Sequence, residues 1–161
     1  MELTEELVRL WLQEVKDPEI PVVSLLELGV ITDVAITDEG AVHIKMTPTF
    51  SGCPAIAYMK NEVEEVLKCK NIADYTVSVS FEEQWNSNMI TKRGRELIKK
   101  FGLAPPPKHN MIIDLDILEG INCPFCNSSN TIMRSPFGPT LCRSLHYCNN
   151  CKQGFEQFKP I

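Results

Sequence analysis

The sequence contains no apolar run approaching the roughly 18 residues that a membrane-spanning helix needs. It is also short of positive charge, because 16 lysines and arginines stand against 21 aspartates and glutamates, for a formal net charge of -5. A chain with this balance has few cations to neutralise phosphates, which disfavours nonspecific binding to nucleic acid. We therefore expect no membrane and no nucleic acid among its partners, and expect proteins or small molecules instead.

Catalytic motifs are scarce as well. There are 3 histidines, and none of them stands in a Glu-x-x-His element, which di-iron carboxylate sites use in pairs. No GxGxxG or P-loop motif for binding a nucleotide occurs in the sequence. These absences predict that the chain is not an enzyme.

Cysteine, in contrast, is abundant. The 7 cysteines are odd in number and clustered in spacing, which disfavours a disulfide framework. The N-terminal stretch MELTEELVRLWLQEV begins with acids and predicts a helix, not a signal peptide. Together these features indicate a reducing compartment, so we expect a cytoplasmic protein whose cysteines serve thiol or metal chemistry.

Periodicity in the first hundred residues predicts the order helix, strand, strand, helix, strand, helix. The expected elements are a helix over 4–16 capped by Thr4, a hairpin within 30–46, a helix opened by Pro54, a strand over 75–81 and a helix over 91–101. This order predicts an α+β fold in which helices pack on a small sheet.

A proline-rich stretch, GLAPPPKHN at 102–110, predicts a domain boundary. We expect an α+β domain over 1–102, and then a proline-rich linker over 103–122 with a strand at 111–118. The last module, 123–161, is too small for a good apolar core, so a bound metal would help it to fold.

Two CxxC pairs near the C-terminus predict that metal site. Cys123 and Cys126 form the first pair, and Cys148 and Cys151 form the second after a further 21 residues. Two such turns bring four thiolates into a tetrahedron, which is the arrangement of a structural zinc ribbon, and they leave no open position for catalysis. An iron–sulfur cluster or a redox pair is the alternative for the same ligands.

Other polar residues of this module have plainer interpretations. Cys142 is expected to be a thiol outside the metal site, with replacement of one ligand as the alternative, and His146 is expected to be a strand residue. Four basic residues stand against one glutamate over 123–161, and a zinc–thiolate centre adds about two negative charges. The module is therefore close to neutral, which disfavours a phosphate-binding face.

Cys53 has a different setting, in TPTFSGCPAIA. It follows a predicted strand and precedes a predicted helix, with Gly52 before it and Pro54 after it. The N-terminus of a helix favours the anionic thiolate, so this position predicts a reactive or metal-binding cysteine. The alternative is a cysteine that fills a cap or a small core position.

The acidic stretch DPEIP is the second candidate. Asp17 and Glu19 flank Pro18, and the simpler interpretation is helix termination followed by a solvated acidic loop. The functional interpretation places a carboxylate near Cys53, where it would accept the thiol proton or join a metal site.

Three segments carry a family resemblance: DPEIPVVSLLELGVITDVAI, TPTFSGCPA and ITKRGRELIKKFGLAPP. They resemble the SufT-like iron–sulfur assembly domain family, whose fold is a small mixed sheet with helices packed on it. With the cysteine-rich ribbon added, the chain from about residue 5 to 159 resembles the PaaD (also called PaaJ) family. Members of that family are accessory proteins of the phenylacetyl-CoA 1,2-epoxidase system of aerobic phenylacetate catabolism.

The resemblance implies a maturation role. In this family the oxygenase chemistry belongs to other epoxidase subunits, and an iron–sulfur flavoprotein reductase supplies electrons. Cys53 matches the reactive cysteine of the family, and Asp17 and Glu19 match its acidic signature. We expect a structural Zn²⁺ and a transient iron–sulfur cluster or iron as cofactors, and epoxidase subunits, above all the reductase, as partners. The alternatives are a permanent structural subunit of the oxygenase complex and a general iron–sulfur targeting factor, and a homodimer is left open.

Overall fold

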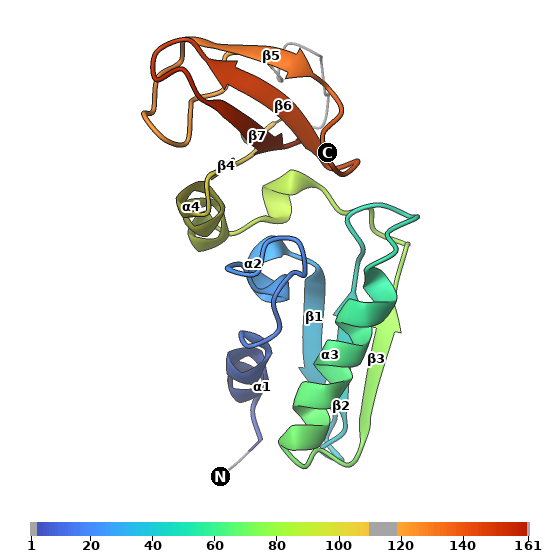
Figure 1. Ribbon diagram of the computed structural model, residues 1–161. Coiled ribbons are helices and arrows are strands. Elements are labelled where there is room, and N and C mark those ends of the chain that lie inside the picture. Colours follow the sequence, from blue (N-terminus) through green and yellow to red (C-terminus); the bar gives the residue numbers. More distant parts are fainter. Residues whose placement is uncertain (1–2, 110–118, 161) are drawn as a thin grey trace. The chain divides into compact units, whose positions relative to one another are not determined.

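The computed structural model of the chain describes residues 3–109 and 119–160. The chain divides into two compact units, Met1–Trp85 and Asn86–Ile161, which are described separately (Figure 1). This division falls earlier than the predicted boundary at 102. The predicted bounds 1–102, 103–122 and 123–161 stay a prediction. The strand expected at 111–118 lies outside the described residues.

The first unit contains a mixed three-stranded sheet in the order β1-β2-β3. Strands β1 (Ile31–Ile36) and β2 (Val42–Met46) form the expected antiparallel hairpin, while β3 (Tyr75–Val79) runs parallel to β2. The parallel pairing requires a crossover between β2 and β3, which α3 (Ile56–Cys69) supplies. The α+β class and the small mixed sheet are thereby confirmed.

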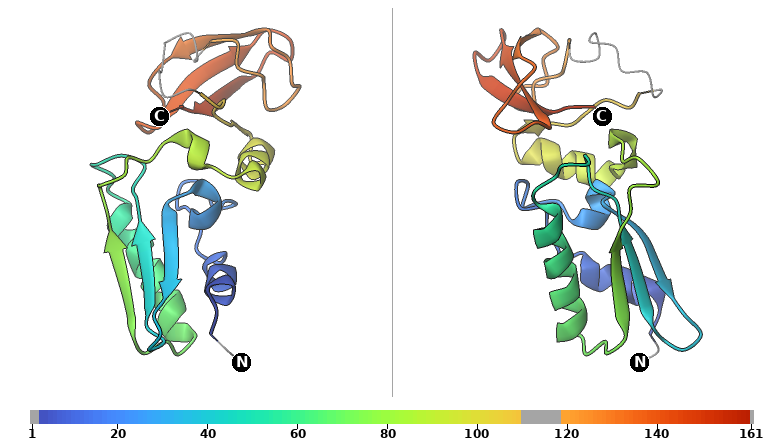
Figure 2. Two further views of the ribbon diagram at one scale, coloured as in Figure 1. Left: turned by 180° about the vertical axis from the view of Figure 1, so that it is seen from behind. Right: turned by 90° about the vertical axis from the view of Figure 1, so that its right-hand side faces the viewer.

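One face of this sheet is apolar and the other is polar. Val42, Ile44 and Met46 of β2 are buried, whereas His43 between them is exposed, as expected for a strand with one covered face. The helix α1 (Glu5–Leu12) contacts β1, and α3 contacts β3 and α1, so both helices cover the apolar face. Figure 2 shows α3 lying along the sheet.

Local capping explains where several helices begin and end. Thr4 Oγ1 accepts a hydrogen bond from the Leu7 N–H at 3.2 Å, which confirms the predicted N-cap of α1. The helix ends at Leu12, earlier than the predicted 16, because the chain from there folds back and Lys16 pairs with Ser24. None of the helices in the described part of the chain is long and apolar enough to span a bilayer.

A short helix, α2 (Leu25–Leu28), was not predicted. Ser24 and Glu27 form a reciprocal capping box at its start, and Gly29 ends it in the left-handed conformation with φ 77°. The motif Ser-x-x-Glu followed by glycine is the local signal that sequence reasoning passed over. The carbonyl of Leu28 at its end accepts a hydrogen bond from the buried Trp85 indole at 3.1 Å.

The second unit contains a four-stranded sheet in the order β4-β7-β6-β5. Its elements are η1 (Ser87–Met89), α4 (Lys92–Lys100), β4 (Leu103–Ala104), β5 (Thr131–Ser135), β6 (Arg143–Cys148) and β7 (Gly154–Phe158). The three long strands form an antiparallel ribbon, and β4 adds to β7 in parallel. The start of the proline-rich stretch is therefore part of this sheet.

The helix α4 has the predicted boundaries. Thr91 caps it through a 3.0 Å hydrogen bond from the Gly94 N–H, and Gly102 follows its end with φ +94°. Within the same unit the Arg95 guanidinium donates hydrogen bonds to the carbonyls of Ser87 and Pro106, which ties the proline-rich stretch to α4.

Candidate functional site

Two similar turns present the four clustered cysteines. In the first, the Asn127 N–H bonds to the Cys123 carbonyl at 2.9 Å; in the second, the Lys152 N–H bonds to the Cys148 carbonyl at 3.0 Å. Asn127 and Lys152 both adopt left-handed backbone conformations, with φ of 60° and 61°. This conformation turns the chain sharply after each second cysteine, so both thiols of a pair face the same point.

The four sulfur atoms fit a tetrahedral metal ion. All of them lie within 4.8 Å of one another, and the pairs Cys123–Cys151 and Cys126–Cys148 have Sγ–Sγ distances of 3.7 and 3.6 Å. A zinc–sulfur bond of about 2.3 Å in a regular tetrahedron requires sulfur atoms about 3.8 Å apart. The group is thus capable of holding a metal, and it takes one ligand pair from each turn.

Electrostatics within the group favours a cation. A hydrogen bond from the Asn150 amide, at 3.6 Å from Cys126 Sγ, lowers the pKa of Cys126 to about 6. Burial first, and then the neighbouring thiols, raise the pKa of Cys151 to about 12. Because four thiolates this close repel one another, a divalent cation is what allows all four to be ionised together.

Cys142 and His146 lie outside the four-cysteine group. Cys142 precedes β6, with its sulfur 3.1 Å from the Thr140 hydroxyl oxygen. His146 lies within β6 as expected, but it is buried, with 3% of its surface exposed. Its ring stacks on Phe155 with centroids 5.4 Å apart, and its Nε2 lies 2.9 Å from Ser144 Oγ. This histidine therefore packs the interior of the ribbon.

Cys53 lies in a loop of the first unit. Its N–H bonds to the Phe50 carbonyl at 3.1 Å, and its carbonyl accepts from the Ile56 N–H at 3.4 Å. The helix α3 begins at Ile56, so the predicted start at Pro54 was wrong by two residues. Cys53 therefore belongs to a turn before the helix, and its half-buried side chain retains access to solvent.

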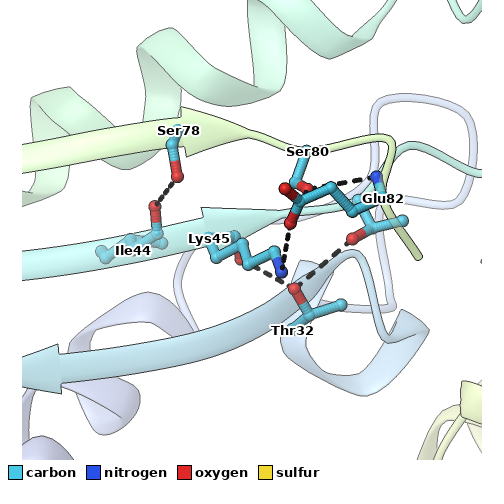
Figure 3. Close-up of polar contacts among 7 residues, drawn as sticks. Thr32, Ile44, Lys45, Ser78, Ser80 and Glu82 are labelled. Carbon is cyan, nitrogen blue, oxygen red and sulfur yellow. Dashed lines mark hydrogen bonds and ion pairs between the residues drawn. The ribbon is translucent and has the colours of Figure 1, made fainter.

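The loop with Cys53 begins at a polar junction that sequence reasoning missed. Thr47 is 1% exposed, and its hydroxyl lies 3.4 Å from that of Thr32 on β1. Nearby, Lys45 Nζ pairs with a Glu82 carboxylate oxygen at 3.6 Å (Figure 3). Strands β2 and β3 are parallel, so the loops that follow both of them emerge at this same edge of the sheet.

Asp17 is engaged in its own turn. One carboxylate oxygen of Asp17 accepts hydrogen bonds from the backbone N–H groups of Glu19 and Ile20, at 2.9 and 2.8 Å. Over 3–109 and 119–160, the four cysteines are the only set of three or more Cys, His, Asp or Glu side chains gathered as metal ligands. The structure thus does not assemble Cys53, Asp17 and Glu19 into a three-ligand site.

Comparisons with known proteins agree with this two-part organisation. Residues 5–80 match the family described as iron-sulfur cluster assembly protein, and residues 114–159 match the PaaD zinc beta ribbon domain. A protein of Escherichia coli (strain K12), provisionally named as one of the subunits of 1,2-phenylacetyl-CoA epoxidase, is 33% identical over 150 residues. These residues are 93% of this chain and 89% of that protein. This chain belongs to the PaaD family. The resemblance expected from the sequence is thereby confirmed.

Other proteins match a smaller part of the chain. An Fe-S protein maturation auxiliary factor of Porphyromonas gingivalis (strain ATCC BAA-308 / W83) is 33% identical over 93 residues, which cover 57% of this chain and 87% of that protein. A solved structure of a domain of unknown function, DUF59, from Bacillus anthracis matches with a TM-score of 0.54 at 25% identity. That match covers 58% of this chain and 90% of the other.

Proposed function

We propose that this PaaD-family chain is a non-catalytic accessory factor that helps to mature an iron–sulfur protein of a phenylacetyl-CoA epoxidase system. The observation that carries the proposal is a single relative, named as an epoxidase subunit, that matches 93% of the chain. The same chain combines an iron–sulfur assembly domain with a PaaD ribbon. The proposed client is the iron–sulfur flavoprotein reductase of that system, in the cytoplasm.

Cys53 is the proposed point of contact with the cluster. A single thiolate supplies only one of the four ligands that such a cluster usually has, so a client or a second copy supplies the others. In transfer, a client cysteine loses its proton and bonds to a cluster iron as the Cys53–iron bond breaks. The proton goes to the released Cys53 thiolate or to solvent, and no electron moves. Asp17 or Glu19 is proposed to accept the thiol proton of Cys53 or to join a metal site there. This role requires the turn of residues 17–20 to open, because the Asp17 carboxylate is engaged within it.

The cysteine group of the ribbon is proposed to hold a structural zinc ion. The sulfur separations of 3.6 and 3.7 Å support this assignment, because they are close to the edge of a zinc–thiolate tetrahedron. Four protein ligands close the coordination sphere, so the ion would stabilise the module and not react. Transient cluster binding at Cys53 and permanent zinc binding in the ribbon are then separate tasks of the two units.

The decisive experiment co-expresses the reductase with wild-type chain or with Cys53→Ser, and measures iron and sulfide in the purified reductase. Cys69→Ser is the matched control, because Cys69 is an exposed cysteine on the same unit. We expect low cluster occupancy with Cys53→Ser alone, at unchanged zinc content. Equal occupancy with both variants would remove Cys53 from the chemistry.

The two alternatives predict other outcomes. A permanent structural subunit would co-purify with the oxygenase in fixed stoichiometry, and Cys53→Ser would leave both the complex and its clusters intact. A general targeting factor would restore unrelated iron–sulfur enzymes as well as the reductase. Measuring aconitase activity in the same cells separates this second alternative from a dedicated factor.

A further inference from the structure

Charge is divided unevenly between the two units. Residues 1–85 carry six lysines and arginines against sixteen aspartates and glutamates, whereas residues 86–161 carry ten against five. The net charge of -5 is therefore the sum of a strongly acidic first unit and a basic second unit. Such asymmetry indicates that the second unit by itself attracts acidic partners.

The second unit also contains an open groove of about 550 Å³, which is within the size range of binding pockets. Its lining includes the rings of Phe101, Phe125, Tyr147 and Phe155. Phe101 is 45% exposed and Phe125 is 52% exposed, so two rings offer much of their surface to solvent. Aromatic rings exposed in a concave site are typical anchors for a partner's apolar side chain.

The shape of the groove depends on Gly102. A Cβ atom at this position would lie 3.3 Å from the Phe125 ring, closer than the ring usually tolerates. Because Gly102 has no side chain and adopts φ +94°, the end of α4 can approach Phe125 closely. Other residues rarely adopt this backbone conformation, so the position of the Phe125 ring at the groove depends on a glycine at 102.

One cation in the groove is available for an acidic ligand. The Arg143 guanidinium is paired with Glu156 at 2.8 Å. Arg134 instead lies over the Tyr147 ring, 5.2 Å from its centroid, and forms no ion pair with any residue in the described ranges. An exposed guanidinium beside an apolar surface suits a peptide in which an acidic residue neighbours an apolar one, because the guanidinium pairs with the carboxylate.

We propose that this groove docks an acidic segment of a partner protein, with an aromatic or branched aliphatic residue as its anchor. The anchor packs on Phe101 and Phe125, and a neighbouring carboxylate pairs with Arg134. The inference rests on the proposed function in one respect: the natural partner is the protein that the chain helps to mature. It adds the place of docking and the chemistry that recognises the partner.

The groove favours a peptide over a nucleic acid. Arg134 is its one cation without a carboxylate partner among the described lining residues, and Glu156 also lies in it. A phosphate backbone needs several cations in line, whereas one guanidinium is enough to pair with one carboxylate of a peptide.

The test measures fluorescence anisotropy of a labelled peptide titrated with the full chain loaded with zinc. The peptide has one central phenylalanine flanked by aspartates and glutamates. One matched peptide replaces the phenylalanine with glycine, and another replaces the acids with lysines. We expect the first peptide to bind at least about tenfold more tightly than either of the others.

Variants locate the site. Arg134→Gln and Phe101→Ala should each weaken binding about five- to tenfold. Lys108→Gln and Phe137→Ala are matched controls, since both residues are exposed and lie outside the groove, and they should bind as the wild type does. Zinc content and circular dichroism establish that each variant is folded.

Several outcomes would overturn the proposal. They are absence of peptide binding, equal binding of the glycine peptide, an equal loss in Lys108→Gln, and tighter binding of a single-stranded RNA of the same length. Cys53→Ser should leave peptide affinity unchanged while it abolishes maturation. Failure of docking and failure of the cluster-transfer role are therefore distinguishable in the same set of proteins.

Discussion

The hydroxyl oxygens of Thr32 and Thr47 lie 3.4 Å apart at the edge of the sheet where the loop with Cys53 begins. Thr32 also donates to the Lys45 carbonyl at 3.2 Å, and the Thr47 N–H bonds to the Val30 carbonyl at 2.7 Å. The first bond joins β1 to β2, and the second joins the residue before β1 to the residue after β2. The start of the Cys53 loop is therefore held by the hairpin.

Replacing Thr47 by valine should lower the free energy of unfolding by about 1 kcal/mol, because a buried hydroxyl loses its hydrogen bond while the shape is kept. Urea denaturation followed by circular dichroism measures the change. Thr47→Ser retains the hydroxyl and is the control for the hydrogen bond. A valine variant as stable as the wild type would show that the contact between the two threonines contributes nothing.

Removing the metal should unfold the ribbon, because the small module relies on the four-thiolate centre. Cys123→Ser should reduce zinc from about one ion per chain to a small fraction of that. Cys142→Ser is the matched variant and should retain its zinc, since Cys142 lies outside the group of four. Metal analysis after dialysis measures both. Zinc loss in Cys142→Ser would assign that thiol to the site.

The stability of the ribbon should fall in mild acid because of His146. Burial lowers the pKa of His146 below its ordinary value, although a hydrogen bond with Gln157 opposes this effect. The unfolded chain then takes up a proton at a higher pH than the folded chain does. The stability that depends on the neutral form of His146 is complete at pH values above about 6.5, the pKa of histidine in the unfolded chain. It is lost as the pH falls toward the lower pKa of His146 in the folded chain.

Comparison with His146→Gln isolates this effect, because both proteins contain the same four cysteines. Between pH 7.5 and 5.5, the wild type should lose stability more steeply than the variant, by at most about 1.4 kcal/mol per pH unit. Denaturant titrations across the pH range measure the two slopes. Parallel slopes would mean that His146 does not titrate in this interval.

Trp85 should be the most sensitive residue of the loop that follows β3. It is 1% exposed, and its indole N–H donates to the Leu28 carbonyl at 3.1 Å. Trp85→Phe should cost about 1–3 kcal/mol, since it removes buried volume and leaves a carbonyl without this donor. Glu83→Gln, at an exposed position, should change stability by less than about 0.5 kcal/mol. Equal stability of Trp85→Phe and Glu83→Gln would show that the contact of Trp85 with Leu28 does not stabilise the fold.

Much of the local structure could be predicted because its causes are local. The caps at Thr4 and Thr91, and the left-handed Gly102 and Asn127, each depend on a residue and its nearest neighbours. The capping box of Ser24 and Glu27 has the same local origin and could have been predicted. The spacing of the CxxC pairs belongs to this group too, since two residues between cysteines already form a turn.

Other features depend on pairings between distant segments. The strand β4 contains only Leu103–Ala104, and two residues are too few for a pattern of alternating apolar and polar side chains. The sequence therefore does not show that β4 pairs with β7, some fifty residues later. The junction of Thr32 and Thr47 needs the register of β1 on β2. The groove needs rings from α4, the first CxxC turn and the ribbon strands to converge on one space.

The sequence by itself determined the α+β class, the two-part organisation, the ligand set proposed for zinc, and membership in the PaaD family. The first three follow from residue type and spacing along the chain, and the family membership follows from the resemblance to known proteins. Only the tertiary structure decided that the four cysteine sulfur atoms gather within 4.8 Å of one another, that Cys53 precedes its helix in a turn, and that Arg134 remains without a carboxylate among the described residues. The physical reason is that distance and burial arise from packing between segments that are far apart in the sequence.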